Sequence, residues 1–213
     1  MKNIPFLKRF VLGPLEVNTY LIADITAGDH PAAVIDPAGE SVEIDKIIEE
    51  QELNLQYIIN THGHIDHIAF NKPFKDKYNP EILIHSADAE WLGIKQDEYL
   101  FDMVGATVSP EADILLKEGD DINIGDITLR VLHTPGHTRG SITLLYNKTA
   151  ITGDTLFASG VGRTDLPGGS YDRLMDSIHN ILLKLPDDTK IYPGHGEEST
   201  IGEEKLNNPF LQI

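Results

Sequence analysis

The chain has 213 residues, 40% of them hydrophobic, and no cysteine, which excludes disulfides, thiolate metal ligands and cysteine nucleophiles. Its 34 acidic and 17 basic residues give a formal net charge of −17, which argues against a nucleic-acid partner because phosphates require a basic face. The length suits one domain with a substantial core, or two closely fused halves.

No apolar run approaches the roughly 20 residues that span a bilayer, so no membrane association is expected. Residues 1–9 are interrupted by charges and proline and lack the apolar core of a signal peptide. The sequence therefore predicts a cytoplasmic protein. It does not predict an oligomeric state.

The first half of the chain predicts strands and helices in succession. Five segments have the residue pattern of strands: 6–12, 18–23, 32–36, 55–60 and 82–85. Residues 42–53 have helical spacing of apolar side chains, with Ser41 as a candidate N-cap. A second helix is expected near residues 66–78, broken or bent at Pro73.

Residues 91–110 are the least regular stretch. Their aromatic side chains, Trp91, Tyr99 and Phe101, either form an apolar wall over a site or pack locally beneath a long connection. The sequence leaves both interpretations open.

The second half predicts two hairpins, a helix and a final strand. Residues 122–129 alternate around a Gly-Asp turn, and residues 141–146 and 150–152 form the second hairpin. Ser170 caps a helix that extends to Leu185 before Pro186. Residues 190–192 are the last predicted strand.

Residues 61–67, Thr-His-Gly-His-Ile-Asp-His, place three imidazoles and a carboxylate directly after a predicted strand. These are ligands that zinc, iron and manganese prefer. On extended backbone, His62 and His64 point to the same side. Asp66 and His67 follow on a loop or first helical turn, where they can face a second ion. This spacing predicts metal binding.

Three further ligand-type residues, His137, Asp154 and His195, each stand next to glycine after a strand-like run. Such a position combines a rigid base with room for close approach to an ion. Taken singly, each is better interpreted as an ordinary turn. Together with the histidine motif they complete five histidines and two aspartates, a number that suits two adjacent ions sharing one carboxylate.

These motifs resemble the metallo-β-lactamase superfamily, in its glyoxalase II-like (hydroxyacylglutathione hydrolase-like) branch. The resemblance runs from Asn18-Thr19-Tyr20 and Ile35-Asp36-Pro37 to Asn208-Pro209-Phe210-Leu211. It implies an α+β fold, an αβ/βα sandwich of two mixed sheets flanked by helices. It also implies a single domain over residues 1–213, with halves of about 1–120 and 121–213, and metals at one edge between the sheets.

The resemblance also implies a ligand set and a reaction. One metal would take His62, His64 and His137, the other Asp66, His67 and His195, and Asp154 would bridge them. The expected cofactors are two divalent ions, zinc in the first place, with iron and manganese as alternatives. The expected enzyme is a hydrolase that cleaves small-molecule thioesters such as S-lactoylglutathione by attack of a metal-bound hydroxide, with Asp66 orienting the nucleophile.

The sequence leaves two interpretations open for each of two nearby residues. Asp36 either supports a ligating histidine or forms a turn before Pro37. Arg163 matches a substrate-contacting basic residue of glyoxalase II, and it either binds a substrate carboxylate or pairs with Asp165. The other histidines are expected not to bind metal: His30, His85, His133 and His179.

The chain departs from glyoxalase II in ways that leave glutathione recognition open. The helical extension that binds glutathione is not found after His195, Ala69-Phe70 replace a Gly-Gly pair, and Thr164 replaces a tyrosine. The segment Gly160–Asp165 also resembles persulfide dioxygenase-like proteins. The alternative function is therefore a mononuclear iron dioxygenase that uses His62, His137 and Asp154. A β-lactamase is disfavoured because no secretion signal is expected.

Overall fold

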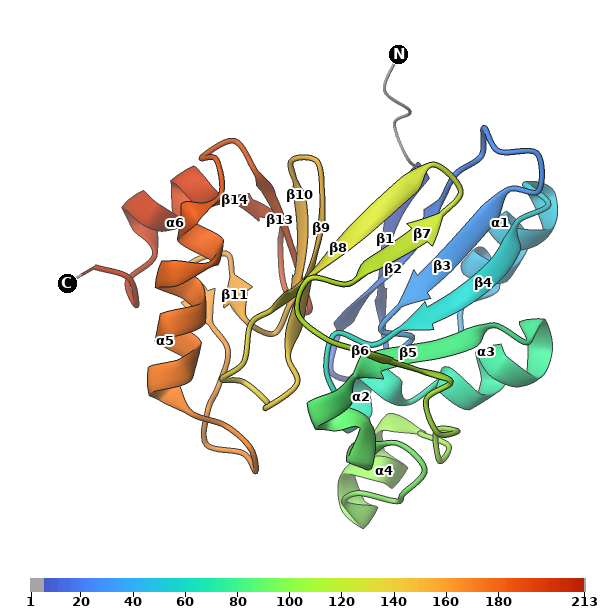
Figure 1. Ribbon diagram of the computed structural model, residues 1–213. Helices are drawn as coiled ribbons and strands as arrows, with labels where there is room; N and C mark the ends of the chain where they lie inside the picture. Colours follow the sequence, from blue (N-terminus) through green and yellow to red (C-terminus); the bar gives the residue numbers. More distant parts are fainter. Residues whose placement is uncertain (1–5, 213) are drawn as a thin grey trace.

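The first 116 residues supply one six-stranded sheet in the computed structural model, which describes residues 6–212 (Figure 1). Its strands are β1 (Phe6–Leu12), β2 (Val17–Ala23), β3 (Pro31–Ile35), β4 (Asn54–Ile59), β5 (Glu81–His85) and β6 (Ile114–Leu116). They lie in chain order, antiparallel from β1 to β3 and parallel from β3 to β6. Residues 1–5, within the segment where no signal peptide is expected, and residue 213 lie outside the described residues.

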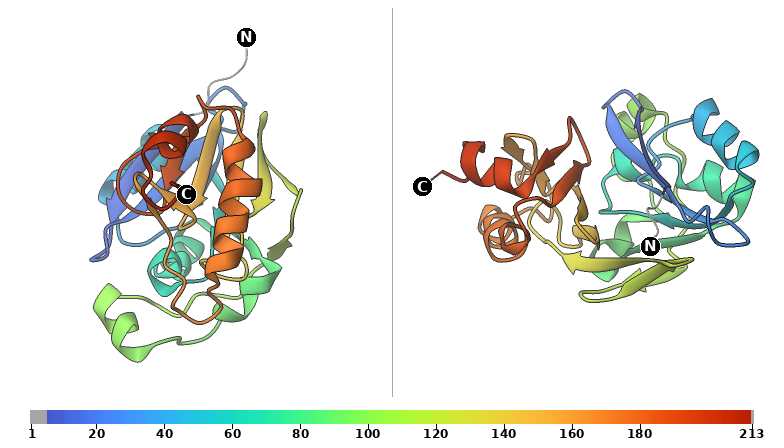
Figure 2. Two further views of the ribbon diagram at one scale, coloured as in Figure 1. Left: turned by 90° about the vertical axis from the view of Figure 1, so that its left-hand side faces the viewer. Right: turned by 90° about the horizontal axis from the view of Figure 1, so that it is seen from above.

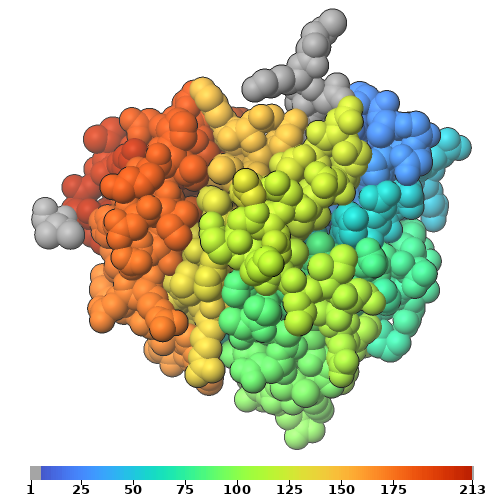
Figure 3. Space-filling model, viewed as in Figure 1, coloured from blue at the N-terminus to red at the C-terminus, as the bar shows by residue number. Residues whose placement is uncertain are grey.

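The later residues supply a second mixed sheet. Its strands are β7 (Asp121–Ile124), β8 (Ile127–His133), β9 (Ile142–Tyr146), β10 (Thr149–Gly153), β13 (Lys190–Pro193) and β14 (Ser199–Thr200). The order is β14-β13-β10-β9-β8-β7, and β10 and β13 are the parallel pair. A small ribbon joins β11 (Leu156–Phe157) to β12 (Gly160–Val161). Figure 3 shows β7 and β8, yellow-green and yellow, crossing the front of the molecule between its two ends.

Helices cover the outer faces of both sheets (Figures 1 and 2). They are α1 (Val42–Glu50), α2 (Ile65–Ile68), α3 (Asn71–Tyr78), α4 (Glu98–Val104), α5 (Tyr171–Asn180) and α6 (Ile201–Asn207), with 3-10 turns η1 (Ser86–Trp91) and η2 (Leu182–Lys184). Strand β2 shows how the layers arise, because its successive side chains point to opposite faces. Leu21 packs toward the helices, whereas Tyr20 and Ile22 pack toward the second sheet. The predicted α+β sandwich of two mixed sheets flanked by helices is confirmed.

The boundary between the sheets falls between residues 116 and 121. We propose a single domain with two halves as the organisation of this arrangement. Within residues 6–212, no helix combines the length and the apolar content that crossing a membrane requires.

Several predicted helix boundaries were correct at the start and wrong at the end. Ser41 and Ser170 cap α1 and α5 as predicted, each hydroxyl accepting a bond from a backbone N–H three residues later. Helix α1 stops at Glu50 instead of residue 53, and α5 stops at Asn180 instead of Leu185, with the turn η2 following. Apolar spacing continues past both ends, so the pattern alone overextended the helices.

The predicted break at Pro73 was also wrong. The helix breaks at residues 69–70, where the Phe70 N–H donates to the Pro37 carbonyl at 2.9 Å instead of continuing the helix. Pro73 occupies the third position of α3, where a backbone N–H has no intrahelical acceptor, so proline costs little there.

Candidate metal centre

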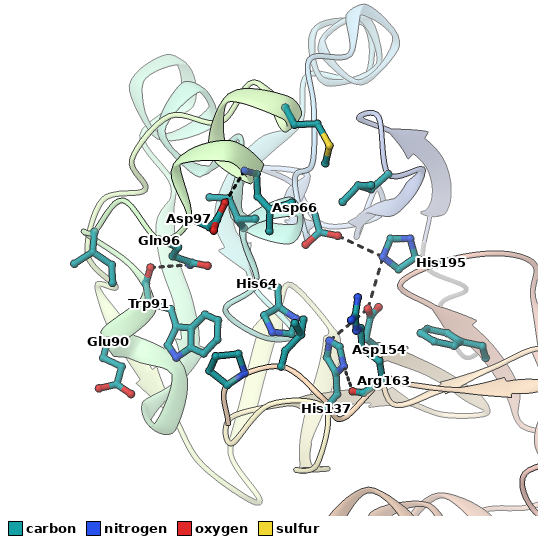
Figure 4. A pocket seen from close by; sticks show the side chains of 18 of the residues that line it. His64, Asp66, Glu90, Trp91, Gln96, Asp97, His137, Asp154, Arg163 and His195 are labelled. Atoms are coloured by element: carbon teal, nitrogen blue, oxygen red, sulfur yellow. Dashed lines mark hydrogen bonds and ion pairs between the residues drawn. The ribbon is translucent and has the colours of Figure 1, made fainter. Parts of the chain in front are cut away.

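The seven predicted ligand side chains meet at one edge, where four strands end. His62 and His64 follow β4, and Asp66 and His67 stand in the short helix α2. His137 follows β8, Asp154 follows β10, and His195 follows β13. Figure 4 shows five of them, His64, Asp66, His137, Asp154 and His195, around one cavity. We call the seven side chains the polar floor.

His62, His64 and His137 form a buried first group. One ligand atom from each lies within 4.8 Å of the others, and their ring centroids are 4.5 to 4.8 Å apart. Their three Nε2 atoms are buried and have no hydrogen-bond partner among residues 6–212. Buried polar atoms almost always have hydrogen-bond partners, so three convergent nitrogens without one are suited to binding a shared cation.

Asp66, His67 and His195 form the second group, again with ligand atoms within 4.8 Å of one another. The Nε2 atom of His195 is 3.5 Å from Asp66 Oδ2 and 3.3 Å from His67 Nε2. Two nitrogens at that distance, beside a carboxylate, favour a shared cation or proton between them.

Asp154 lies between the two groups. Its Oδ2 is 3.5 Å from His137 Nε2 and 3.6 Å from His195 Nε2, and its Oδ1 is 3.5 Å from His67 Nε2. Oδ1 is a further buried atom without a hydrogen-bond partner in the described chain. One carboxylate therefore faces both groups, the arrangement expected of a bridging ligand.

Hydrogen bonds on the far side of the imidazoles fix their orientation. His137 Nδ1 donates to the Arg163 carbonyl at 2.8 Å, and His67 Nδ1 donates to Asp36 Oδ2 at 2.9 Å. A carbonyl or carboxylate oxygen only accepts, so Nδ1 carries the proton and Nε2 presents a lone pair to the floor. Second partners of this kind orient metal-binding histidines in general.

Asp36 has the supporting role, one of the two that the sequence left open. Besides His67 it accepts from Thr61 N at 2.7 Å and from Thr61 Oγ1 at 2.6 Å. The Thr61 hydroxyl gives its proton to Asp36, so it can accept from His62 Nδ1, 3.1 Å away. A single buried carboxylate thus orients one histidine of each group.

The two groups differ in charge. Burial lowers the pKa of His62 well below its ordinary value and that of His64 to about 3, so these imidazoles are neutral. Burial would also lower the pKa of His67, but the carboxylates of Asp154, Asp66 and Asp36 raise it to about 10, so without a bound cation its Nε2 also carries a proton, whose place a metal cation would take. The second group is therefore rich in negative charge, which favours a bound cation.

Glycine makes the close approach of two floor residues feasible. A Cβ atom on Gly194 would lie 2.1 Å from Asp154 Oδ1 and 2.8 Å from His67 Cε1. A Cβ atom on Gly162 would lie 1.9 Å from the Asp154 carbonyl oxygen. Gly194, next to His195, is one of the glycines that were predicted to give room beside a candidate ligand, whereas Gly162 was not predicted.

Sequence reasoning missed Asp88, which joins the two loops of the first group. This buried carboxylate accepts from Gly63 N at 2.9 Å, Gly140 N at 2.6 Å and Thr138 Oγ1 at 2.6 Å. Gly63 lies between two floor histidines, and Thr138 follows a third. No motif signals this role, because Asp88 lies in a 3-10 turn 25 residues or more from the residues that it bonds.

The Asn18-Thr19-Tyr20 segment, noted only for its family resemblance, anchors the loop of His195. Asn18 Nδ2 donates to the Pro193 and Gly196 carbonyls at 2.9 and 2.8 Å, and Tyr20 Oη donates to Pro193 O at 2.6 Å. The first sheet therefore holds a candidate ligand that the second sheet supplies.

A cavity of about 1030 Å³ opens above the polar floor. Apolar side chains surround it, and we call the following six the apolar wall: Trp91, Ile94, Leu100, Met103, Phe157 and Leu166. The Trp91 ring lies 5.2 Å from the ring of His64. Tyr99 is 75% exposed and Phe101 is packed in the core, so only Trp91 of the three predicted aromatics contributes to the wall.

Arg163 lies at the cavity and forms a two-pronged pair with Asp165, at 2.8 Å from Nε and 2.7 Å from a terminal nitrogen. Its carbonyl, not its side chain, contacts a floor histidine. Substrate binding by Arg163 stays a prediction. The four histidines expected not to bind metal, His30, His85, His133 and His179, belong to none of the clusters that could hold an ion in residues 6–212.

The donor set fits divalent cations. Five imidazoles and two carboxylates supply only nitrogen and oxygen atoms as possible ligands. Four of these atoms are buried and have no hydrogen-bond partner in the described chain.

The sequence matches the family model of the metallo-beta-lactamase superfamily over residues 12–195. It is 39% identical to the hydroxyacylglutathione hydrolase GloC of Haemophilus influenzae over 192 residues, which cover 84% of this chain and 87% of that one. It is 36% identical to the probable metallo-hydrolase YqgX of Bacillus subtilis, with 96% of both chains covered.

Solved structures give a similar result. The chain is similar to the BLEG-1 B3 metallo-beta-lactamase, with 34% identity, a TM-score of 0.87 and coverage of 98% and 100% of the two chains. TTHA1623 in a di-iron-bound form gives 31% identity and a TM-score of 0.84, covering 96% and 100%. ETHE1 from Myxococcus xanthus gives 31% identity and a TM-score of 0.80, covering 96% and 83%.

Proposed function

The chain belongs to the metallo-beta-lactamase superfamily, whose members are metal-dependent hydrolases, and from this we propose that it cleaves small-molecule thioesters such as S-lactoylglutathione. The observation that carries this proposal is the polar floor, which has two groups of ligand-type side chains, a carboxylate between them and four buried ligand-type atoms without a hydrogen-bond partner among residues 6–212. The similarity to a hydroxyacylglutathione hydrolase supports thioesters as the substrate class.

His62, His64 and His137 would hold one divalent cation, Asp66, His67 and His195 a second, and Asp154 both. We propose zinc, with iron and manganese as alternatives; the similarity to TTHA1623, solved in a di-iron-bound form, supports iron as one of them. Bound there, two cations would supply a hydroxide nucleophile at neutral pH and polarise the substrate carbonyl.

The chain's own residues would position the reactants. Burial would raise the pKa of Asp66, but His67 and His195 lower it below its ordinary value, so the carboxylate is ionised and can accept a hydrogen bond that orients the nucleophile. Asp66 is thus the proposed catalytic residue. No general acid is needed for the leaving group, because an ordinary thiol has a pKa of about 8.5 and leaves as a thiolate.

The test is hydrolysis of S-lactoylglutathione by protein reconstituted with zinc, iron or manganese, with Asp154→Ala as control. Metal-dependent turnover that the substitution abolishes is the expected result. If a fully metallated protein hydrolyses no member of a broad thioester panel, the proposal is wrong.

A second candidate is a mononuclear iron dioxygenase that oxidises glutathione persulfide. The Gly162-Arg163-Thr164-Asp165 loop favours it through its resemblance to that branch, and His62, His137 and Asp154 would form the two-histidine, one-carboxylate triad. One iron per chain, oxygen uptake and sulfite production would support this candidate. Two metals per chain without oxygen uptake would exclude it.

We also propose a cytoplasmic protein without nucleic-acid or membrane partners. The net charge of −17 supports the first of these absences.

A further inference from the structure

We propose that the substrate carries an apolar group beside the scissile bond, and that the site selects against anionic groups such as the carboxylates of glutathione. The inference rests on the proposed thioester hydrolysis and narrows its substrate class: S-lactoylglutathione would then be cleaved more slowly than a neutral thioester that carries an apolar group. The apolar group can stand on the acyl or on the thiol side, and the experiment below separates the two.

The apolar wall comes from two distant parts of the chain. Trp91, Ile94, Leu100 and Met103 come from the segment that leads into and forms α4, whereas Phe157 and Leu166 follow the second sheet's β10. Leu15, from the turn between β1 and β2, extends the lining. The same surface above the floor is therefore apolar on more than one side.

Much of this apolar surface faces solvent. Ile94 is 53% exposed, Leu15 is 41% exposed and Met103 is 38% exposed. Single exposed apolar residues are common, but several gathered around a large cavity mark a binding surface. An apolar substituent would remove these side chains from water, which favours its binding.

The polar side chains of the lining, outside the floor, are largely occupied within the protein. Gln96 Nε2 donates to the Gly63 and Trp91 carbonyls at 2.8 and 3.1 Å. Asp97 caps α4 by accepting from Leu100 N at 2.8 Å. These bonds use both N–H groups of the Gln96 amide, and Asp97 has no donor, so neither side chain offers a hydrogen-bond donor to an anionic substrate group.

The charges at the cavity disfavour an anion. Arg163 is the only lysine or arginine in the lining that the structure describes, and its guanidinium donates two hydrogen bonds to the Asp165 carboxylate. Glu90 and Asp97 line the same cavity. A glutathione moiety brings two carboxylates, which would meet these acidic groups without a free cation to pair with.

The experiment compares thioesters that differ in one property at a time. The zinc-loaded protein is assayed with acetyl, butyryl, hexanoyl and phenylacetyl esters of N-acetylcysteamine, a neutral thiol, and with the same acyl series on glutathione. We expect kcat/KM to rise at least about tenfold from acetyl to hexanoyl on the neutral thiol. We also expect each glutathione ester to be the poorer member of its pair.

A second series fixes the acetyl group and varies the thiol from methanethiol to hexanethiol. A rise in the first series alone places the apolar group on the acyl side, and a rise in the second alone places it on the thiol side. A flat response in both series, or a preference for glutathione, would overturn the inference.

Binding measured without turnover separates this inference from the proposed function. Trp91 is the single tryptophan of the chain and belongs to the wall, so its fluorescence reports occupancy of the cavity. S-Hexyl and S-methyl thioethers of N-acetylcysteamine have no ester to cleave. If no thioester is hydrolysed but the hexyl thioether binds at least about tenfold tighter, thioesterase activity fails and the apolar selectivity stands.

Substitutions test the contribution of individual cavity residues to this selectivity. Met103→Ser should reduce hexanoyl turnover more than acetyl turnover, whereas Leu206→Ser, which removes a 75% exposed leucine outside the cavity, should leave both unchanged. Glu90→Gln should raise kcat/KM for glutathione esters relative to their neutral counterparts. A gain of this kind cannot come from damage to the fold, and its absence would contradict the charge argument.

Discussion

The polar floor and the apolar wall belong to one cavity but are built in opposite ways. Each floor residue stands directly after a strand or in the short α2, and further bonds hold its side chain or loop from behind, as Asp36 holds His67 and Asn18 holds the His195 loop. The wall comes from loops, the ends of η1 and β11 and the seven-residue α4, and its side chains Ile94 and Met103 are exposed to solvent.

This difference separates chemistry from selectivity. Changes behind the floor should alter metal content and turnover for every substrate, because they displace ligand atoms that two sheets position. Changes in the wall should alter the relative rates of substrates and leave metal content unaffected.

The largest effect is expected from Gly194→Ala. The new Cβ would lie 2.1 Å from Asp154 Oδ1, so either the His195 loop or the bridging carboxylate must move. A displacement near 1 Å at a reacting centre can cost on the order of 100-fold in rate, so we expect kcat/KM to fall at least that far, with loss of bound metal.

Gly28→Ala is the matched control, because nothing lies within 4 Å of the added Cβ. Metal analysis by mass spectrometry and kcat/KM should be close to wild type in this variant. Full metal content and activity in Gly194→Ala would show that the floor is more tolerant than its contacts indicate.

A smaller loss is expected from Asp36→Asn. An amide in place of Oδ2 donates a proton, so His67 Nδ1 could no longer donate to it and would favour the tautomer with a proton on Nε2. The proton on His67 Nε2 would then point into the second group, where it would disfavour the binding of a metal cation. Loss of such an orienting partner typically costs 10 to 100-fold in metal affinity or activity.

The measurement is metal affinity by competition with a chelator, with Asp188→Asn as the same chemical change at an exposed ion pair. An unchanged affinity in Asp36→Asn would mean that Thr61 and the loop backbone alone orient the histidines.

The sequence predicted much of the floor because its ligands are encoded locally. The spacing of His62, His64 and His67 is short, and His137, Asp154 and His195 each follow a recognisable strand and glycine. The predicted strands were likewise confirmed where they were long. β6, β11, β12 and β14 were missed, because segments of two or three residues have no readable alternation.

The residues that hold the floor from outside, such as Asp88 and Asn18, could not be predicted in the same way. Asp88 bonds residues 25 and 52 positions away, and Asn18 reaches carbonyls 175 positions away. Such contacts depend on how two sheets pack. The wall was ambiguous for a related reason, because only the fold decides that Trp91 faces the cavity while Phe101 enters the core.

Asp88→Asn should affect stability more than specificity. Both carboxylate oxygens accept bonds, from Gly63 N and Thr138 Oγ1 on one and Gly140 N on the other, and an amide nitrogen cannot accept. Leaving a buried donor unpaired costs about 1–3 kcal/mol, which for this chain length lowers Tm by roughly 2 to 12 °C.

Thermal unfolding of the metal-loaded protein checks this, with Asp76→Asn at an exposed pair as control. The loss of kcat/KM should be similar for neutral and anionic thioesters, since both meet the same floor. A change confined to one substrate class would instead place Asp88 within reach of the substrate.

The smallest effect is expected at Arg163. Its guanidinium is engaged by Asp165, and the hydrogen bond with Arg163 lowers the pKa of Asp165 to about 2, so the pair is intact throughout the neutral range. Exposed pairs of this kind contribute little, and the Arg163 carbonyl that holds His137 survives substitution of the side chain. Arg163→Ala should therefore change KM for any thioester by less than about threefold.

Asp165→Ala is the informative partner, because it frees the guanidinium and should lower KM for glutathione esters more than for neutral ones. A tenfold rise in KM for glutathione esters alone in Arg163→Ala would show that the Arg163 side chain leaves Asp165 to bind a substrate carboxylate. The cavity would then select for anionic substrates at this position.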